Sequence, residues 1–395
     1  MVTLTSADNA LKKVYLNVIS NQLNVGVNPL LAKIEQTSAD VWGKEIVKLA
    51  PVGINGGIGA GTEDGQLPTS AGNKYLQFTS SLKNLYGKIE ISDKAIRASE
   101  NSVGAFVNLL NAEMEGLLKA SSFNFGRMLY GDGSGKLATV ASSTSTQITV
   151  DSVKNLMEGM VVDFLEADGD AVTGFQGVRI TAIDRVNKKI KISKTVDTTL
   201  IVSTVYLTVQ GSKDNELTGL GAIFNTTGTI YGVDRSANPC LVPYIESSVG
   251  EITDAKIQLA IDTLEENTGS EVDFITCAYD VKRLYQEYLA TNSRNINVME
   301  LEGGYKAISY NGIPVIADRF IEDGTMYLLN SKEFALHQLC DWQWLEGDDG
   351  RILKQNAGYP TYQATLVKYA DLICDKPSAQ AKLSGIAAVP VTPAE

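Results

Sequence analysis

Few residues in this sequence have the type and spacing that catalysis needs. His337 is the one histidine, and it lies in EFALHQLCDWQW without a catalytic partner close in sequence, so a structural or surface role is favoured. Asp348 and Asp349 form a carboxylate pair that could do acid–base work, but Gly347 and Gly350 flank them and indicate a turn. No G-x-S-x-G or H-E-x-x-H motif occurs. We therefore expect no enzyme, and keep a hydrolase that uses the two aspartates as an alternative.

Two glycine-rich stretches could be mistaken for phosphate loops. Gly57–Gly61 reads GIGAG, but no helix follows it to direct an N-terminus at a phosphate. Gly135-Lys136 does not belong to a P-loop, because Leu137 stands where Ser or Thr would hold magnesium and Tyr130 stands where the first glycine should be. We expect no nucleotide cofactor.

The metal-binding patterns are also incomplete. Glu166–Asp170 carries carboxylates at alternate positions, as calcium loops do, but Ala171 stands where such a loop needs glycine and the later Glu is missing. An exposed hairpin tip is the better interpretation. The cysteines are far apart and include no C-x-x-C pair, so no zinc site is indicated: Cys240, Cys277, Cys340 and Cys374.

Composition describes an acidic globular chain. It has 395 residues, of which 44% are hydrophobic, which predicts two or three folded units. Lys and Arg number 34 against 46 Asp and Glu, a formal net charge of −12, so we expect weak or no direct nucleic-acid binding. The N-terminus lacks the apolar core of a secretory signal and no long apolar run occurs. We expect synthesis in the cytoplasm, reduced thiols and no membrane segment.

The longest predicted element is a helix over Ser102–Tyr130. Its apolar residues recur in steps of three and four, Asn101 or Ser102 could cap its start, and the glycines from Gly131 onward should stop it in a left-handed turn. At 1.5 Å per residue it would be roughly 40 Å long, so it needs an extended body or a partner chain to lie across. The expected core positions are Phe106, Leu110, Met114, Leu117, Leu118 and Phe125, with Leu117 and Leu118 at the centre of the buried stripe.

Before this helix, Gly53–Asn73 is rich in Gly, Ser and Thr. Strand-like Trp42–Val52 precedes it and strand-like Tyr75–Ser81 and Tyr86–Ile91 follow it, which predicts a long hairpin reaching away from the body. Such a stretch has little material for a core of its own, so its order should come from a neighbouring subunit. Residues 1–35 read as an arm with a loose helix over Asp8–Leu23.

After the helix, residues 138–211 are dense in β-branched residues and turns. The connection Arg185–Lys188 predicts a tight hairpin, and the whole segment predicts a small all-β barrel or sandwich inserted into the main body. Its expected strands are Gln147–Val150, Met160–Glu166, Gly177–Arg185, Lys189–Ser193 and Thr204–Val209.

The remaining sequence returns to a mixed body at Glu216–Phe224. Two helices are predicted, at Thr253–Asn267 and Asp280–Ala290, and Trp342 and Trp344 should share one face of a strand. A hairpin is expected at Asn311-Gly312. The expected strands are Asp273–Ala278, Lys306–Tyr310, Ile313–Asp318, Thr325–Asn330, Tyr362–Val367 and Ala370–Cys374. The fold class is therefore α+β, with a disordered tail from Ala387.

The order of these parts resembles the major capsid proteins of tailed bacteriophages, which have the HK97-type fold. The resemblance is most specific in Val103–Gly135, where EMEGLL and RMLYGDGSG look like the long spine helix and its exit turn. It extends to Tyr310–Asp318 (YNGIPVIAD) and to Gln363–Ile386 (containing YADLICDKPSAQAKLSGI). By resemblance, Pro51–Ile91 would be the family's extended loop, the E-loop.

The resemblance implies a division of the chain. Residues 1–50 would be the N-terminal arm and first strand, 51–91 the E-loop, 92–137 the spine helix of the peripheral domain and 138–211 the inserted β domain. Residues 212–362 would supply the axial domain and the rest of the peripheral domain, and 363–395 the closing strands and tail. The implied subunit contacts in the E-loop are Gly57, Gly59, Gly61, Glu63, Asp64, Leu67, Lys74 and Tyr75.

The implied function is a virion shell. Copies of the chain would form hexamers and pentamers of an icosahedral head around double-stranded DNA, assembled in the host bacterial cytoplasm. Portal protein, and possibly a decoration protein, would be further partners. Because the first 35 residues are too short for the helical scaffold that many members carry, a separate scaffolding protein is expected, docking on the arm near Lys12 and Lys13 and on the inner face of the spine helix.

Some members join a lysine of the E-loop to an asparagine near the last peripheral strand. Lys74 lies in this loop, but Thr361–Lys368 contains no Asn and Asn356 is only nearby, so the resemblance does not support cross-linking here. Other readings remain open at this point: an encapsulin-like compartment, whose members are usually shorter and lack such an insertion, and another phage structural protein such as a tail tube, which the long helix disfavours.

Overall fold

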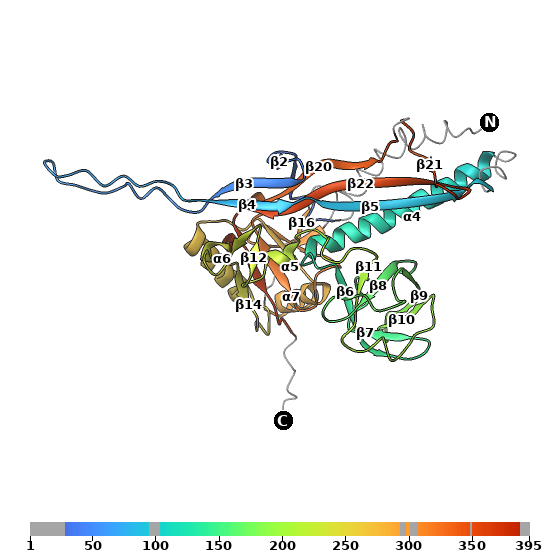
Figure 1. Cartoon of the computed structure of the whole chain (residues 1–395). Helices are drawn as coiled ribbons and strands as arrows, with labels where there is room; N and C mark the ends of the chain where they lie inside the picture. The colour runs from blue at the N-terminus through green and yellow to red at the C-terminus, as the bar shows by residue number, and fades with distance from the viewer. Residues whose placement is uncertain (1–27, 95–102, 293–297, 301–305, 348–349, 388–395) are drawn as a thin grey trace, which may run out of the picture.

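The computed structural model describes residues 28–94, 103–292, 298–300, 306–347 and 350–387, with the side chains of 103–112, 292, 298–300 and 306–307 outside that description. A long sheet forms an upper layer, and helix α4 runs beneath it (Figure 1). A second sheet with its helices and a separate β-barrel lie below, side by side near the C-terminal end of α4. The expected arm helix Asp8–Leu23 and the tail beyond 387 fall outside the described residues.

Helix α4 spans Val103–Tyr130, as the apolar spacing predicts. Met114, Leu118 and Phe125 are buried, at 0%, 6% and 2% exposed. Leu117 was expected beside Leu118 at the centre of the stripe, but it is half-buried and packs at the edge of the core. The expected core positions Phe106 and Leu110 lie outside the described side chains.

The end of α4 differs from the expected left-handed stop at Gly131. The Gly131 N–H donates to the Met128 carbonyl at 3.1 Å, which tightens the last turn without a positive φ. The left-handed residues follow later, at Gly133 (φ 87°) and Gly135 (φ 80°). The helix therefore ends in a tightened turn at Gly131, and the left-handed glycines then redirect the chain into the barrel.

The upper sheet has the order β1–β20–β22–β21, with β5 also paired to β22. The two expected strands Tyr362–Val367 and Ala370–Cys374 are in fact one strand, because β5 pairs with β22 without interruption from Ser92↔Thr361 to Lys83↔Ala370. Trp342 and Trp344 are both buried, and the Trp342 ring packs edge-on against Phe125 of α4 at 6.1 Å. The strands are β1 (Glu35–Thr37), β5 (Lys83–Ser92), β20 (Phe334–Trp344), β21 (Lys354–Gln355) and β22 (Thr361–Cys374).

A smaller sheet carries the long loop. Strands β3 (Glu45–Pro51) and β4 (Tyr75–Ser81) are antiparallel, and the chain between them projects far from the body (Figure 1). The expected single strand Trp42–Val52 is divided into β2 (Val41–Trp42) and β3, because Gly43 turns the chain with φ 66°.

The lower sheet has the order β14–β23–β19–β15–β18–β17–β16. Helix α6 (Asp254–Thr268) begins at Thr253, whose side chain accepts from the Lys256 N–H, and ends at left-handed Gly269, as predicted. The predicted hairpin at Asn311-Gly312 joins β17 to β18. The strands are β14 (Tyr244–Glu246), β15 (Phe274–Cys277), β16 (Val298–Glu300), β17 (Lys306–Tyr310), β18 (Ile313–Ala317), β19 (Met326–Leu329) and β23 (Ala381–Leu383), and the second helix is α7 (Tyr279–Asn292).

Short elements connect these layers. Helix α5 (Leu220–Ile223) lies at the end of α4, and strands β12 (Thr229–Ile230) and β13 (Val233–Asp234) form a two-stranded ribbon. Three short 3₁₀ turns complete the described body: Pro239–Leu241, Ser331–Glu333 and Pro377–Ala379. Within the described residues, no helix is both long and apolar enough to cross a membrane.

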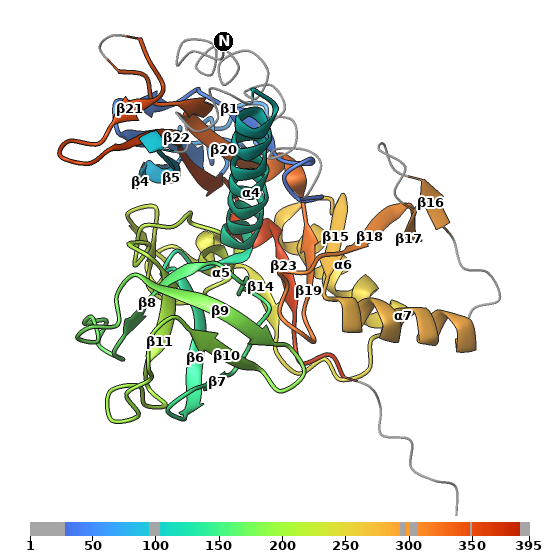
Figure 2. The same ribbon diagram turned by 90° about the vertical axis from the view of Figure 1, so that its right-hand side faces the viewer.

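The barrel is closed, with the order β10–β7–β6–β11–β8–β9, and stands apart from the lower sheet when the molecule is turned (Figure 2). It has its own apolar core, which includes Phe164, Ile180 and Leu207. The first strand begins at Lys136, two residues before the expected boundary at 138. The strands are β6 (Lys136–Ser143), β7 (Ile148–Val150), β8 (Val161–Leu165), β9 (Val178–Asp184), β10 (Lys189–Ile192) and β11 (Tyr206–Val209).

Candidate assembly surfaces

Residues 52–74 form a projecting loop with almost no packing of its own. Ile54, Ile58 and Leu67 are 82%, 77% and 86% exposed. One ladder contact closes its base, where the Val52 N–H donates to the Lys74 carbonyl at 2.9 Å. Apolar side chains displayed on a thin projection indicate a binding surface, because nothing in the described chain removes them from water.

The loop positions expected to meet a neighbour are indeed accessible. Gly57 is half-exposed, because its backbone lies against Ala71 on the returning limb. The other expected contact positions are exposed: Gly59, Gly61, Glu63, Asp64, Leu67, Lys74 and Tyr75. The structure brings them together on one projection, and their contact with a second copy remains a prediction.

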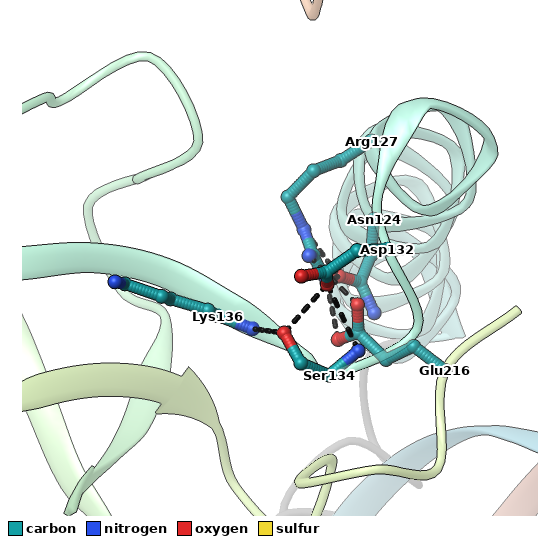
Figure 3. A network of polar contacts seen from close by, with 6 residues as sticks. All are labelled: Asn124, Arg127, Asp132, Ser134, Lys136 and Glu216. Carbon is teal, nitrogen blue, oxygen red and sulfur yellow. Dashed lines mark hydrogen bonds and ion pairs between the residues drawn. The ribbon is translucent and has the colours of Figure 1, made fainter. Parts of the chain in front are cut away.

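At the C-terminal end of α4, a buried ion pair connects the helix to the chain that returns from the barrel (Figure 3). Arg127 Nη1 donates to Glu216 Oε2 at 2.8 Å and Nη2 donates to Oε1, while the two side chains are only 4% and 2% exposed. Asn124 Oδ1 accepts from Arg127 Nη2 at 2.6 Å. This arrangement satisfies both charges and fixes the direction in which the chain leaves and re-enters the body.

The exit turn is built from local polar contacts. Asp132 Oδ1 accepts from the Ser134 N–H at 3.0 Å, and the Ser134 hydroxyl accepts from the Lys136 N–H at 3.3 Å (Figure 3). The returning segment joins it where the Asp214 N–H donates to the Ser134 carbonyl at 3.1 Å. Gly219 lies so close to the end of α4 that a Cβ there would be 2.3 Å from the Met128 carbonyl oxygen. The two connections to the barrel are therefore packed as one joint.

A lysine is buried between the upper sheet and α4. Lys368 is 0% exposed, and its Nζ donates to Gln338 Oε1 and Asp341 Oδ1, both at 2.8 Å. Its ammonium also lies 5.5 Å from the centre of the Phe125 ring. Burial lowers the pKa of Lys368, and Asp341 opposes that shift. The sequence carried no signal for this site, since a lysine within a strand is ordinarily placed at the surface.

A buried carboxyl joins the base of the loop to the same sheet. Asp371 Oδ2 accepts from the Ser80 hydroxyl of β4 at 2.6 Å, and Oδ1 accepts from the Thr218 N–H at 2.8 Å. Burial raises the pKa of Asp371, and these hydrogen bonds lower it in part. The contact links the loop-bearing hairpin, β22 and the segment that follows the barrel.

The residues considered for catalysis do not assemble into a catalytic site in the described part of the chain. His337 is 1% exposed, and its Nδ1 lies 2.9 Å from the Ala39 carbonyl oxygen, which makes it a structural residue. Asp348 and Asp349 fall outside the described residues. No cluster of three potential metal ligands occurs among the residues described.

Asn356, weighed as a cross-linking residue, holds local contacts. Its side-chain amide donates to Glu90 Oε1 at 2.9 Å and to Thr361 Oγ1 at 2.8 Å. Lys74, the lysine of the loop, is exposed at the loop base. These contacts leave the question of a covalent bond between copies untested.

Comparison with solved structures identifies the fold, whereas comparison of the sequence finds no relative. No family model and no curated protein matches the sequence. A chain of the cyanophage A-1(L) capsid asymmetric unit matches with a TM-score of 0.56 and 13% identity, over 92% of this chain and 93% of that chain. This chain has the fold of a phage capsid protein. The predicted α+β capsid fold is thereby confirmed.

Two further matches are weaker. The capsid of an empty GTA particle matches with a TM-score of 0.48 and 12% identity, over 90% of both chains. The holo-SrpI encapsulin complex from Synechococcus elongatus PCC 7942 matches with a TM-score of 0.46 and 10% identity, over 93% of this chain and 91% of that chain. Both scores are too low to decide between kinds of shell.

Proposed function

We propose that this chain is the shell-forming protein of a tailed-phage head. Its copies assemble into hexamers and pentamers of an icosahedral capsid that encloses double-stranded DNA. The fold shared with the cyanophage capsid chain supports this proposal. The observation that carries it is the projecting loop 52–74, whose apolar residues have no cover from the described part of their own chain.

The physical argument concerns where the loop obtains its order. Fixing a backbone residue costs about 1–2 kcal/mol, and an isolated loop without a core cannot recover that cost. A neighbouring copy recovers it by burying Ile54, Ile58 and Leu67. A loop that projects from one end of the molecule and binds elsewhere on the next copy makes a head-to-tail contact. Such contacts generate rings when the rotation between copies closes, and rings are the capsomers that the proposed shell needs.

The finer assignments belong to the same proposal. We assign residues 1–50 to the arm and first strand, 51–91 to the E-loop, 92–137 to the spine helix, 138–211 to the inserted domain, and 212–362 and 363–395 to the axial and closing regions. A scaffolding protein, a portal protein and a decoration protein are proposed partners. The net charge of −12 supports weak contact with the packaged DNA, because like charges repel. Assembly takes place in the host cytoplasm and the product is the virion.

Electron microscopy of the purified full chain tests the proposal. Closed icosahedral particles are the expected product, with the scaffolding protein supplied if the chain alone gives aberrant closure. Tubes would indicate another phage structural protein, and single molecules under every condition would contradict a shell. The contents of the particles distinguish the two kinds of shell: nucleic acid inside indicates a phage head, and protein inside indicates an encapsulin-like compartment.

A further inference from the structure

The barrel carries a concentrated basic surface on an otherwise acidic chain. The stretch 179–194, which contains β10 and most of β9, holds six cationic side chains and one carboxylate, Asp184, a formal charge of +5 in a chain whose total is −12. At its tip, Val186 is 90% exposed. We call 179–194 the basic hairpin. Its cations are Arg179, Arg185, Lys188, Lys189, Lys191 and Lys194.

Folding of the barrel explains little of this cluster. Lys194 is the exception, because its Nζ donates to the Gly174 carbonyl and lies 5.0 Å from the centre of the Phe175 ring. In the described part of the chain, none of the six cations forms an ion pair within 4 Å, although Lys189 lies opposite Asp184 in the strand register. Elsewhere the barrel does use such a contact, since Lys154 pairs with Asp323 of the main body at 2.5 Å. The register places no two of these cations directly opposite each other, so their repulsion is spread over the hairpin, and a bound anionic surface would relieve it.

An acidic surface of matching size lies on α6 and the turn after it. Residues 258–273 hold five carboxylates and no cation, and Leu259 beside them is 60% exposed. We call this stretch the acidic helix end. One of its carboxylates, Asp273, already accepts a hydrogen bond from the Ser331 N–H within the chain. The carboxylates are Asp262, Glu265, Glu266, Glu271 and Asp273.

The placement of these acids also opposes the stability of the helix. Glu265 and Glu266 lie in the last turn of α6, where the helix dipole is negative and basic residues would be favoured; that turn contains none. The exposed acids Asp262, Glu265, Glu266 and Glu271 form no ion pair with a described residue. Both surfaces therefore carry unbalanced charge at a local cost to the fold.

The two surfaces lie apart within one molecule. Figure 1 places α6 at the end from which the long loop projects, and the barrel at the other end of the lower layer. The loop base and α6 are neighbours, because Val52 and Ile54 line a groove together with Thr263 and Leu264. In the turned view the barrel and α6 are again on different sides (Figure 2). A contact between the basic hairpin and the acidic helix end needs two copies of the chain.

We propose that the basic hairpin of one copy binds the acidic helix end of a neighbouring copy. The proposal rests on the shell function proposed above and adds a second contact to it. Because the acidic helix end and the loop lie at the same end of the molecule, one head-to-tail interface accommodates both contacts. Complementary charge would steer the copies together and fix their register, with Val186 and Leu259 as small apolar contacts.

Nucleic acid is the other polyanion that could bind the hairpin, and the observations favour a second copy. Residues 179–194 contain no Phe, Tyr or Trp on which bases could stack. The net charge of −12 repels a nucleic-acid polyanion as it approaches. The chain itself supplies an acidic surface of opposite charge and similar magnitude.

Charge reversal tests the contact in the full chain. Arg185→Glu with Lys191→Glu changes two exposed cations that have no described partner, and Glu265→Lys with Glu266→Lys changes the other side. Lys33→Glu with Lys44→Glu is the control, because it alters the net charge equally at two exposed positions away from the hairpin. Self-association is measured by sedimentation velocity, shell formation by electron microscopy, and folding by circular dichroism.

Either reversal alone should lower the self-association constant about tenfold or more near 0.1 M salt, and the difference should vanish near 1 M salt. The four-fold variant, in which both signs are exchanged, should recover association to within about threefold of the unchanged chain. The control pair should leave it unchanged. Recovery by exchange is the readout that a purely structural role of the hairpin would not produce.

Each contrary result has a definite meaning. Normal shells from the Arg185→Glu/Lys191→Glu variant would overturn the contact and leave the shell function standing. A different outcome is that the unchanged chain forms tubes or other open assemblies. If either charge reversal weakened these assemblies and the four-fold variant restored them, the contact would be supported and the shell function overturned. Single molecules of the unchanged chain at low salt, with the scaffolding protein supplied, would overturn both. Loss of binding to a double-stranded DNA duplex, with self-association unchanged, would assign the hairpin to nucleic acid instead.

Discussion

Arg127 and Glu216 lie 89 residues apart in sequence and pair through two hydrogen bonds in the interior. The whole barrel is inserted between them. The pair therefore closes the main body as if the insertion were absent, and it fixes the joint from which the barrel projects. With the joint closed in this way, the main body can keep its own core whether or not the inserted barrel is folded.

Glu216→Gln should destabilise the body by about 3–5 kcal/mol, because it leaves the Arg127 charge buried without its counter-charge. The free energy of unfolding from urea titration measures the loss. Replacing both residues by methionine should recover much of it, since no charge then remains buried. Lys88→Gln is a matched control: its pair with Glu90 spans 4.0 Å at 52% and 47% exposure, so a loss beyond about 1 kcal/mol there would contradict the argument.

The loop prediction follows from exposure. Deleting Gly57–Ser70 removes residues that make no contact with the core, so the subunit should fold with unchanged unfolding free energy. It should fail to close shells, because the apolar side chains that would anchor it on a neighbour are gone. Electron microscopy and circular dichroism provide the two readouts. Normal particles from this deletion would show that the loop is dispensable.

Helix α4 offers a graded test of burial. Leu118→Asp should destabilise the chain by several kcal/mol, because a carboxylate cannot be left unpaired at a position only 6% exposed. Leu117→Asp should cost less, since Leu117 is half-buried at the edge of the core beneath Gly87. Urea titration of the two variants ranks them. Equal losses would mean that the stripe is centred on both residues, as the sequence pattern predicts.

Asp371 should produce a pH dependence of stability. Burial raises its folded pKa above that of the unfolded chain, so its protonated form is favoured by folding. Its contribution is therefore fully present below the ordinary aspartate pKa of about 3.9, and is lost as pH rises through the folded pKa. Compared with Asp371→Asn, the unchanged chain should lose stability as pH rises above about 4. A constant difference between the two across that range would contradict the assignment.

The sequence predicted the local structure well where the signal was local. The spacing of apolar residues predicted α4, and Thr253, Gly269 and Asn311-Gly312 marked the ends of α6 and the turn of a hairpin because caps and turns depend on neighbouring residues. The buried charges could not be found this way. Lys368 and Asp371 lie in a strand and find their partners on β20, β4 and residue 218, and such pairings exist only after the sheet has formed. The strand β6 was missed because Lys136 and the following small residues resemble the exit loop.

The barrel should fold as an isolated fragment. Its buried residues form a core separate from that of the main body, and its six strands close without help from either sheet. The fragment should begin at Lys136, because β6 pairs with β7 and β11 and its loss would open the barrel. Residues 136–211 should give well-dispersed amide proton signals, whereas 145–211, which lacks β6, should not. Collapsed spectra from the longer fragment would mean that Lys154–Asp323 and the joint at Ser134 are needed to hold the barrel closed.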